Sequence, residues 1–125
     1  NNLEKVDAAV VSKEEKIKEE PGKEVLKESK TLAKYRDYIN KLNGTLTALL
    51  LNETDAVIKE IAVRDLAKEL KEVKEKVKTV IFDGVITQRI LDISADKGIR
   101  YIIGVKIGNI VKKPVSVKIF TLDDL

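Results

Sequence analysis

Short apolar runs alternate with segments of helical spacing between residues 45 and 120, and this alternation restricts the possible folds more than any other feature. The apolar runs occupy 45–51, 56–62, 79–82, 99–105 and 115–120. The first two flank a turn at 52–55 and predict an antiparallel hairpin. Near-continuous apolar strands that alternate with helices are typical of sheets with parallel strands. We therefore predict an α/β fold, in which helices flank a small mixed sheet that contains parallel strands.

Two segments between the predicted strands have helical spacing. The first covers 64–78 and repeats apolar residues at positions expected to face inward: Leu66, Leu70, Val73 and Val77. The second begins after Thr87, whose hydroxyl is suited to an N-cap, and ends at Gly98. Its apolar residues Ile90, Leu91 and Ala95 are expected to face the sheet.

A charged helical arm is predicted before the sheet. Residues 1–42 read as two amphipathic helices broken at Pro21-Gly22, and the second is expected to stop at Asn43-Gly44. The predicted domains are therefore an arm or linker at 1–43 and an α/β domain at 44–125. The arm holds 10 basic and 9 acidic residues, so it is not an electrostatic arm for nucleic acid. Its narrow apolar stripe packs either on the domain or on a second copy, which would form a homodimer.

The missing residue types exclude several kinds of chemistry. The chain has no Cys and no His, which excludes disulfides, Cys/His nucleophile pairs and His-ligated metals. No apolar run approaches the roughly 20 residues that span a bilayer, so we expect a cytoplasmic location. The chain begins Asn1-Asn2 and contains no Met, and we expect it to be part of a longer protein.

Two loops at the ends of predicted parallel strands deserve inspection, because ligands of such sheets lie there. Asp83-Gly84 is either a metal ligand or ordinary turn chemistry, with the turn favoured. Gly104–Gly108 is a weak candidate for phosphate binding, and a strand-to-loop transition is the favoured account. Arg89 stands in the first turn of its helix against the helix dipole, which suggests an anionic partner, either Asp83 or an external group.

The strongest charge asymmetry lies between Gly98 and Phe120, which holds five basic residues and no acidic one. With Arg89 they form the predicted partner- or RNA-binding set: Arg89, Arg100, Lys106, Lys112, Lys113 and Lys118. Clustered Lys neutralises phosphates, but Lys on an edge strand also prevents aggregation of sheets, and both readings stay open. Phe82, Tyr101 and Phe120 are expected in the core and not on a base-stacking surface.

The chain from Thr79 to Pro114 resembles the C-terminal region of archaeal DnaG-type primases, and residues 44–74 are similar as well. The resemblance rests on a composite of short motifs: Asp83-Gly84, Thr87-Gln88-Arg89, Lys97-Gly98 and Gly108-Asn-Ile-Val-Lys-Lys-Pro114. It implies a parent protein with a Toprim domain that binds magnesium and synthesises RNA primers. It also implies association with the RNA exosome through a cap subunit with an S1 domain, and a preference for adenine-rich RNA.

The Toprim signature, a Glu-Gly motif with an Asp-x-Asp pair, is missing from this sequence. We therefore expect no catalytic residue, metal site or cofactor in this chain, although its parent resembles a nucleotidyltransferase. The leading hypothesis is a non-catalytic interaction domain that docks the primase on the exosome cap and aids binding of adenine-rich RNA. The alternatives are a module that contacts template or RNA, and a dimerisation domain.

Overall fold

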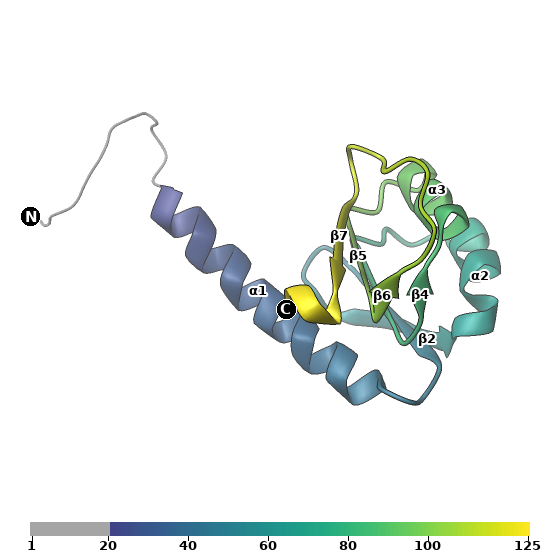
Figure 1. Cartoon of the computed structure of the whole chain (residues 1–125), viewed down its shortest axis with the longest axis horizontal. Helices are drawn as coiled ribbons and strands as arrows, with labels where there is room; N and C mark the ends of the chain where they lie inside the picture. The colour runs from purple at the N-terminus through teal and green to yellow at the C-terminus, as the bar shows by residue number, and fades with distance from the viewer. Residues whose placement is uncertain (1–20) are drawn as a thin grey trace, which may run out of the picture. The chain divides into compact units, whose positions relative to one another are not determined.

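The computed structural model describes residues 21–125, with side chains from Lys30 onward. Helix α1 (Pro21–Leu42) ends directly before Asn43-Gly44, as predicted. The chain divides within α1 into two compact units, of which one ends at Ala33 and the other runs from Lys34 to Leu125. Figure 1 labels helices and strands of the second unit. The predicted helix before Pro21 lies outside the described residues, and the predicted division into 1–43 and 44–125 stays a prediction.

The unit from Lys34 to Leu125 contains the end of α1 and a series of short strands and helices. In chain order they are β1 (Thr47–Leu51), β2 (Val57–Ala62), α2 (Leu66–Glu72), β3 (Thr79–Phe82), β4 (Val85–Ile86), α3 (Gln88–Asp96), β5 (Tyr101–Gly104), β6 (Lys106–Ile107) and β7 (Lys118–Thr121). Short 3₁₀ helices at Val63–Asp65 and Leu122–Asp124 precede α2 and follow β7. The strands β4 and β6 were not predicted, because two residues carry no readable periodicity.

The main sheet is mixed, with strand order β2-β1-β3-β5-β7. Strand β1 runs antiparallel to β2 and β3, whereas β3, β5 and β7 are parallel. A second, two-stranded sheet joins β4 and β6 in parallel. The predicted hairpin and the predicted mixed α/β fold with flanking helices are therefore confirmed.

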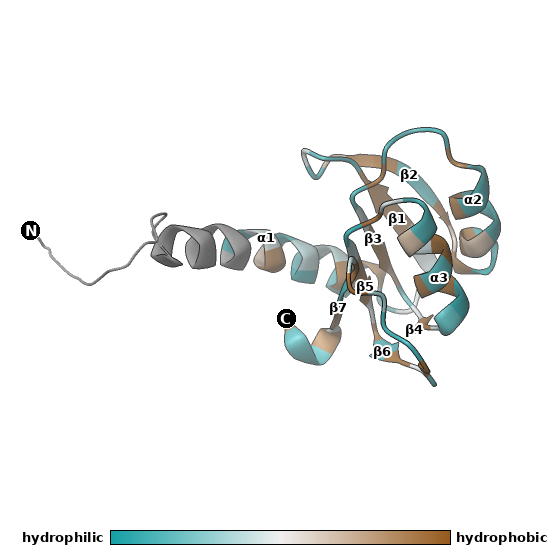
Figure 2. Cartoon of the chain, turned by 90° about the horizontal axis from the view of Figure 1, so that it is seen from above, coloured by the Kyte–Doolittle hydropathy of each residue, from teal (hydrophilic) through white to brown (hydrophobic). Residues whose placement is uncertain are grey.

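Helices α2 and α3 cover one face of the main sheet. In Figure 2 the strands in the middle of this sheet are mainly brown, the colour of apolar residues. The core on that face includes Leu70, Val80, Leu91 and Ile102, all fully buried. The end of α1 covers the opposite face.

That placement follows from the contacts of Tyr35. Tyr35 of α1 contacts Thr79 and Tyr101. These two residues alternate along their strands with Val80 and Ile102, so they point away from α2 and α3.

One helix prediction is partly wrong. The predicted helix over 64–78 ends at Glu72, and Val73 adopts an extended backbone with ψ of 136°. Val73 and Val77 are nevertheless buried, as predicted. A spacing of four residues places side chains on one side of an extended chain as well as of a helix, and β-branched Val favours the extended form.

The boundaries of α3 follow its predicted signals. The Thr87 hydroxyl accepts a hydrogen bond from the N–H of Ile90, and Gly98 adopts a positive φ of 74° directly after the helix. Ile90 and Leu91 are buried and Ala95 packs against the core, so the predicted inward face is confirmed.

Candidate docking surface

Asp83 lies directly after β3 and holds the loop that leads into β1. Its buried carboxylate accepts a hydrogen bond from the N–H of Leu46 over 2.9 Å. Leu46 has a positive φ of 54°, which L-amino acids with branched side chains rarely adopt. This contact favours the turn interpretation of Asp83. Within residues 21–125 as described, no three Asp or Glu side chains are grouped so that they could hold a metal ion.

Of the two partners considered for Arg89, an internal carboxylate such as Asp83 and an external group, Asp83 is not paired with it. Arg89 is exposed and makes no ion pair in the part of the chain that the structure describes. The Asp83 carboxylate is buried and engaged by the Leu46 amide, so a guanidinium on the surface of α3 has no access to it.

Gln88 begins α3, one residue after β4, and holds the loop that follows β6. Its Oε1 accepts the N–H groups of Val111 and Lys112 over 2.8 and 3.0 Å. Its Nε2 donates to the carbonyl of Lys112 over 2.8 Å and to Asp92 over 3.0 Å. Sequence reasoning treated Gln88 only as part of a motif, because its partners lie 23 and 24 residues further along the chain.

The two glycines of the predicted phosphate loop, at the end of β5 and directly after β6, allow these segments to pack closely against the chain at β4. A Cβ atom on Gly104 would lie 2.7 Å from Ile86 Cγ1 and 3.0 Å from the carbonyl oxygen of Gly84. A Cβ atom on Gly108 would lie 2.9 Å from Val85 Cγ1. The structure therefore agrees with the favoured strand-to-loop account of this segment.

The six predicted binding residues fall into two groups. Arg100 directly precedes β5, and Lys118 is the first residue of the neighbouring strand β7. The N–H of Lys118 donates to the Arg100 carbonyl over 2.8 Å. Arg100 also pairs with Glu53 over 3.1 Å, so its charge is partly neutralised. These two residues belong to the edge where β5 and β7 start.

The second group consists of Arg89, Lys106, Lys112 and Lys113. All four are exposed, and none forms an ion pair within the described residues. They lie on adjoining elements, because β6 pairs with β4 and Gln88 ties the Lys112 loop to α3.

Exposed valines accompany these cations. Val85 of β4 is 39 % exposed and Val111 is 89 % exposed. We call this set the β4 surface, and its members are Val85, Arg89, Lys106, Val111, Lys112 and Lys113.

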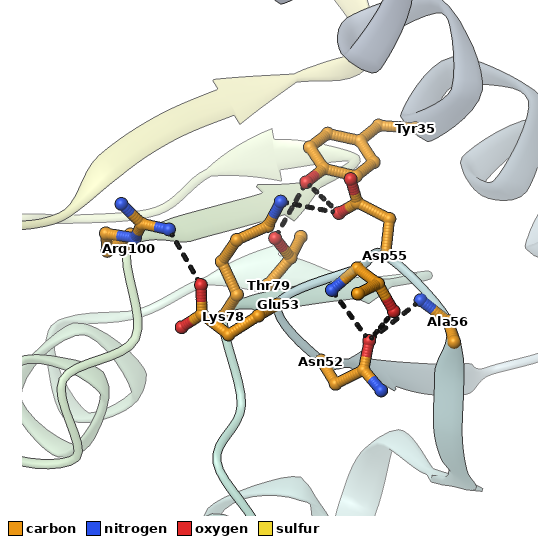
Figure 3. A network of polar contacts seen from close by, with 9 residues as sticks. Tyr35, Asn52, Glu53, Asp55, Ala56, Lys78, Thr79 and Arg100 are labelled. Atoms are coloured by element: carbon orange, nitrogen blue, oxygen red, sulfur yellow. Dashed lines mark hydrogen bonds and ion pairs between the residues drawn. The ribbon is translucent and has the colours of Figure 1, made fainter.

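A buried polar network ties the end of α1 to the sheet (Figure 3). The Tyr35 hydroxyl donates to Asp55 Oδ1 over 2.6 Å and lies 2.9 Å from the hydroxyl oxygen of Thr79. Lys78 Nζ lies 2.9 Å from the same Asp55 oxygen. Sequence reasoning missed the network because its members lie far apart in the chain.

Two pKa values shift in this network. Burial, followed by the hydrogen bond to Asp55, raises the pKa of the Tyr35 hydroxyl. Burial also acts to raise the pKa of Asp55, but hydrogen bonds from Tyr35 and Lys78 outweigh it and lower that pKa. The network therefore keeps Tyr35 neutral and Asp55 charged, which is the state that the hydrogen bonds require.

The predicted aromatic core is confirmed for Phe82, which is fully buried. Tyr101 and Phe120 are half-buried and stack with ring centroids 6.4 Å apart. Lys78 Nζ lies 5.9 Å from the centre of the Tyr101 ring and Tyr35 packs beside it, so protein groups already occupy its surroundings.

An open groove of about 440 Å³ lies between the end of α1 and the strands β1 and β2. It is lined by Tyr38, Lys41, Leu42, Thr45, Thr47, Leu49, Val57 and Glu60. None of the residues predicted for binding lines this groove. No described helix is long and apolar enough to cross a membrane.

Comparison with known proteins finds similarity to archaeal proteins named DNA primase DnaG. The chain is 53 % identical to the protein of Methanothrix thermoacetophila over 87 residues, which is 70 % of this chain and 20 % of that protein. It is 41 % identical to the protein of Metallosphaera sedula over 110 residues, which is 87 % of this chain and 26 % of that protein. The match to the protein of Methanosarcina barkeri is 52 % identical over 70 % of this chain and 17 % of that protein.

The chain thus spans about a fifth of the length of the curated relatives that it matches. No protein-family profile matches the chain, and no solved structure matches it. The similarity to archaeal DnaG primases therefore concerns one part of those proteins.

Proposed function

We propose that this chain is the non-catalytic, C-terminal interaction region of a cytoplasmic archaeal DnaG-type primase, and that it docks the primase on the cap of the RNA exosome. The similarity to proteins named DNA primase DnaG supports the parent. The match covers only 20 % and 26 % of those two proteins. The remainder of such a parent is long enough to hold a Toprim domain with its magnesium ions. The S1-domain subunit of the cap is the proposed partner.

The β4 surface is the observation that carries the docking proposal. Four cations stand exposed there without an ion pair in the described part of the chain, beside two exposed valines. Protein interfaces combine an apolar centre with a polar rim, and unpaired charges steer a partner of opposite charge. The buried polar groups around Tyr35 are by contrast paired with one another, which gives them a structural role.

Calorimetry with the purified S1-domain cap subunit tests this function. The complete chain is titrated into the subunit at about 50 mM and about 200 mM salt, concentrations between which phosphate-directed binding loses much of its affinity. Saturable one-to-one binding that persists at the higher salt is the expected result. Heats no larger than those of dilution at both salt concentrations would remove the docking proposal.

RNA binding is the second candidate, because the four cations of the β4 surface could neutralise phosphates. Single-stranded RNA that contacts all four should show a slope of log affinity against log salt of about −3, from roughly −0.7 for each phosphate. The assay is fluorescence anisotropy with labelled oligo(A), and the control variant replaces Arg89, Lys106, Lys112 and Lys113 with Gln. Binding that is equal in wild type and variant would place RNA elsewhere on the chain.

A further inference from the structure

We infer that the β4 surface is the docking site itself, and that it fits a folded protein with an apolar face bordered by acidic side chains. This inference rests on the proposed docking function and specifies the surface and the chemistry of the partner. Neither the similarity to DnaG primases nor the fold identifies these residues as an interface.

The valines of this surface are held in place by buried or bonded neighbours. Gln88 accepts the N–H of Val111 and makes three further hydrogen bonds, so the backbone that carries this valine is fixed. Val85 packs over Gly108, where even a Cβ atom would come within 2.9 Å. An apolar side chain presented from a fixed backbone loses little conformational entropy when a partner covers it.

The exposure of Val111 is the second observation. The Val111 side chain is 89 % exposed, so its burial contributes almost nothing to the stability of the isolated chain. A partner that covered it would remove this apolar surface from water, which favours binding. Single exposed apolar residues are common on proteins. Here, however, both valines are connected to Gln88: Val85 precedes it by three residues along the chain, and the N–H of Val111 donates to its side chain.

The charges define the partner. In the ladder between β4 and β6, Val85 is the register partner of Lys106, so their side chains point to the same side of the small sheet. Lys112 and Lys113 follow Val111, and Arg89 follows Gln88. One exposed carboxylate, Asp92, accepts a hydrogen bond from Gln88 beside these four cations. A rim in which cations outnumber carboxylates complements an acidic rim.

The combination favours a protein over RNA. RNA phosphates would use the cations but gain nothing from aliphatic valines, since bases bind by stacking on aromatic rings. An acidic-rimmed apolar protein face uses both kinds of side chain. Replacement of the valines should therefore weaken binding of a protein partner and leave binding of RNA unchanged.

The test compares four proteins in calorimetric titrations with the S1-domain cap subunit: wild type, V85S/V111S, K106Q/K112Q and the control V57S. Val57 lies on edge strand β2 and is 41 % exposed, close to the 39 % of Val85. The valine pair should raise Kd about tenfold or more at both salt concentrations, as expected for residues central to an interface. The lysine pair should weaken binding mainly at low salt, and V57S should leave Kd within about twofold.

The outcomes distinguish a failure of this inference from a failure of the proposed docking function. If wild type binds and V85S/V111S binds equally well, the docking function stands and this surface is wrong. If wild type does not bind, the docking function and this inference both fail. Should V85S/V111S unfold in circular dichroism, V111S alone decides, because a side chain this exposed contributes little to folding. If K106Q/K112Q loses oligo(A) binding while V85S/V111S keeps its affinity for both oligo(A) and the cap subunit, the surface binds RNA and the inference is overturned.

Discussion

Replacing Tyr35 with Phe isolates the hydrogen bonds by which α1 is fastened to the sheet. The ring keeps its fully buried position, so packing is retained and only the hydroxyl is lost. The variant loses a 2.6 Å hydrogen bond to the Asp55 carboxylate and a 2.9 Å contact with Thr79. Asp55 retains Lys78 at 2.9 Å, so its charge stays paired.

The magnitude follows from these two bonds. A hydrogen bond to a charged group contributes about 1.5–3 kcal/mol, and the Thr79 hydroxyl is left without its buried partner, so we expect a loss of about 2 kcal/mol. For a unit of this size the midpoint of thermal unfolding should fall by roughly 8–16 °C.

The effect should depend on pH in both directions. Since the pKa of Asp55 is lowered in the folded protein, its contribution is complete above about pH 4 and is lost as the pH falls below that value. Since the pKa of Tyr35 is raised, its contribution is complete below about pH 10 and is lost as the pH rises further. In Y35F both the acid loss and the alkaline loss should become smaller.

The assay is urea unfolding followed by circular dichroism at pH 3, 7 and 10.5, with about equal slopes required for all variants. The matched control is Y38F, because Tyr38 stands on the same helix, is half-buried and makes no hydrogen bond within the described residues. We expect Y38F to change the free energy of unfolding by less than about 0.5 kcal/mol. If Y35F and Y38F unfold at the same urea concentration at pH 7, the network does not fasten α1 and the reasoning is refuted.

Three further substitutions test the surroundings of β4. D83A leaves the Leu46 amide without its acceptor and should lower the free energy of unfolding by about 1–3 kcal/mol, measured by urea unfolding against D96A as an exposed control; equal midpoints would contradict it. G104A places a Cβ atom 2.7 Å from Ile86 and 3.0 Å from a backbone oxygen, and should cost about 1–3 kcal/mol, whereas G44A, where a Cβ meets nothing within 4 Å, should cost only its backbone strain. Q88A should change stability by less than about 1 kcal/mol yet accelerate hydrogen exchange at the Val111 and Lys112 amides, and unchanged exchange there would show that Gln88 does not hold the loop.

Several features were readable from the sequence because they depend on local patterns. The apolar runs fixed the five strands of the main sheet, and the Thr87 and Gly98 signals fixed the limits of α3. A cap needs only the residue itself and the amides that follow it, so the chain carries the whole signal within a few positions. The burial of Val73 and Val77 was also predictable, although the end of the helix at Glu72 and the extended backbone of Val73 were not.

The candidate site was only half readable. Its cations stood out as a basic stretch, but the sequence did not separate Arg100, which pairs with Glu53, from Lys106 and Lys112, which form no ion pair in the described residues. Such a separation depends on which loop folds against which strand. The role of Gln88 was unreadable for the same reason, since an amide side chain suits a helix start, a solvated surface or a loop clamp equally well.

By itself the sequence determined the fold class, the approximate positions of the five main-sheet strands, the limits of α3 and much of the core, because hydrophobic periodicity acts within short segments. Only the tertiary structure decided which distant residues meet: Tyr35 with Asp55 and Thr79, Asp83 with Leu46, and Gln88 with the Val111 loop. Each of these contacts joins residues at least 20 positions apart. Their partners are set by sheet order and strand register, which arise from the packing of the whole unit and leave no trace in local spacing.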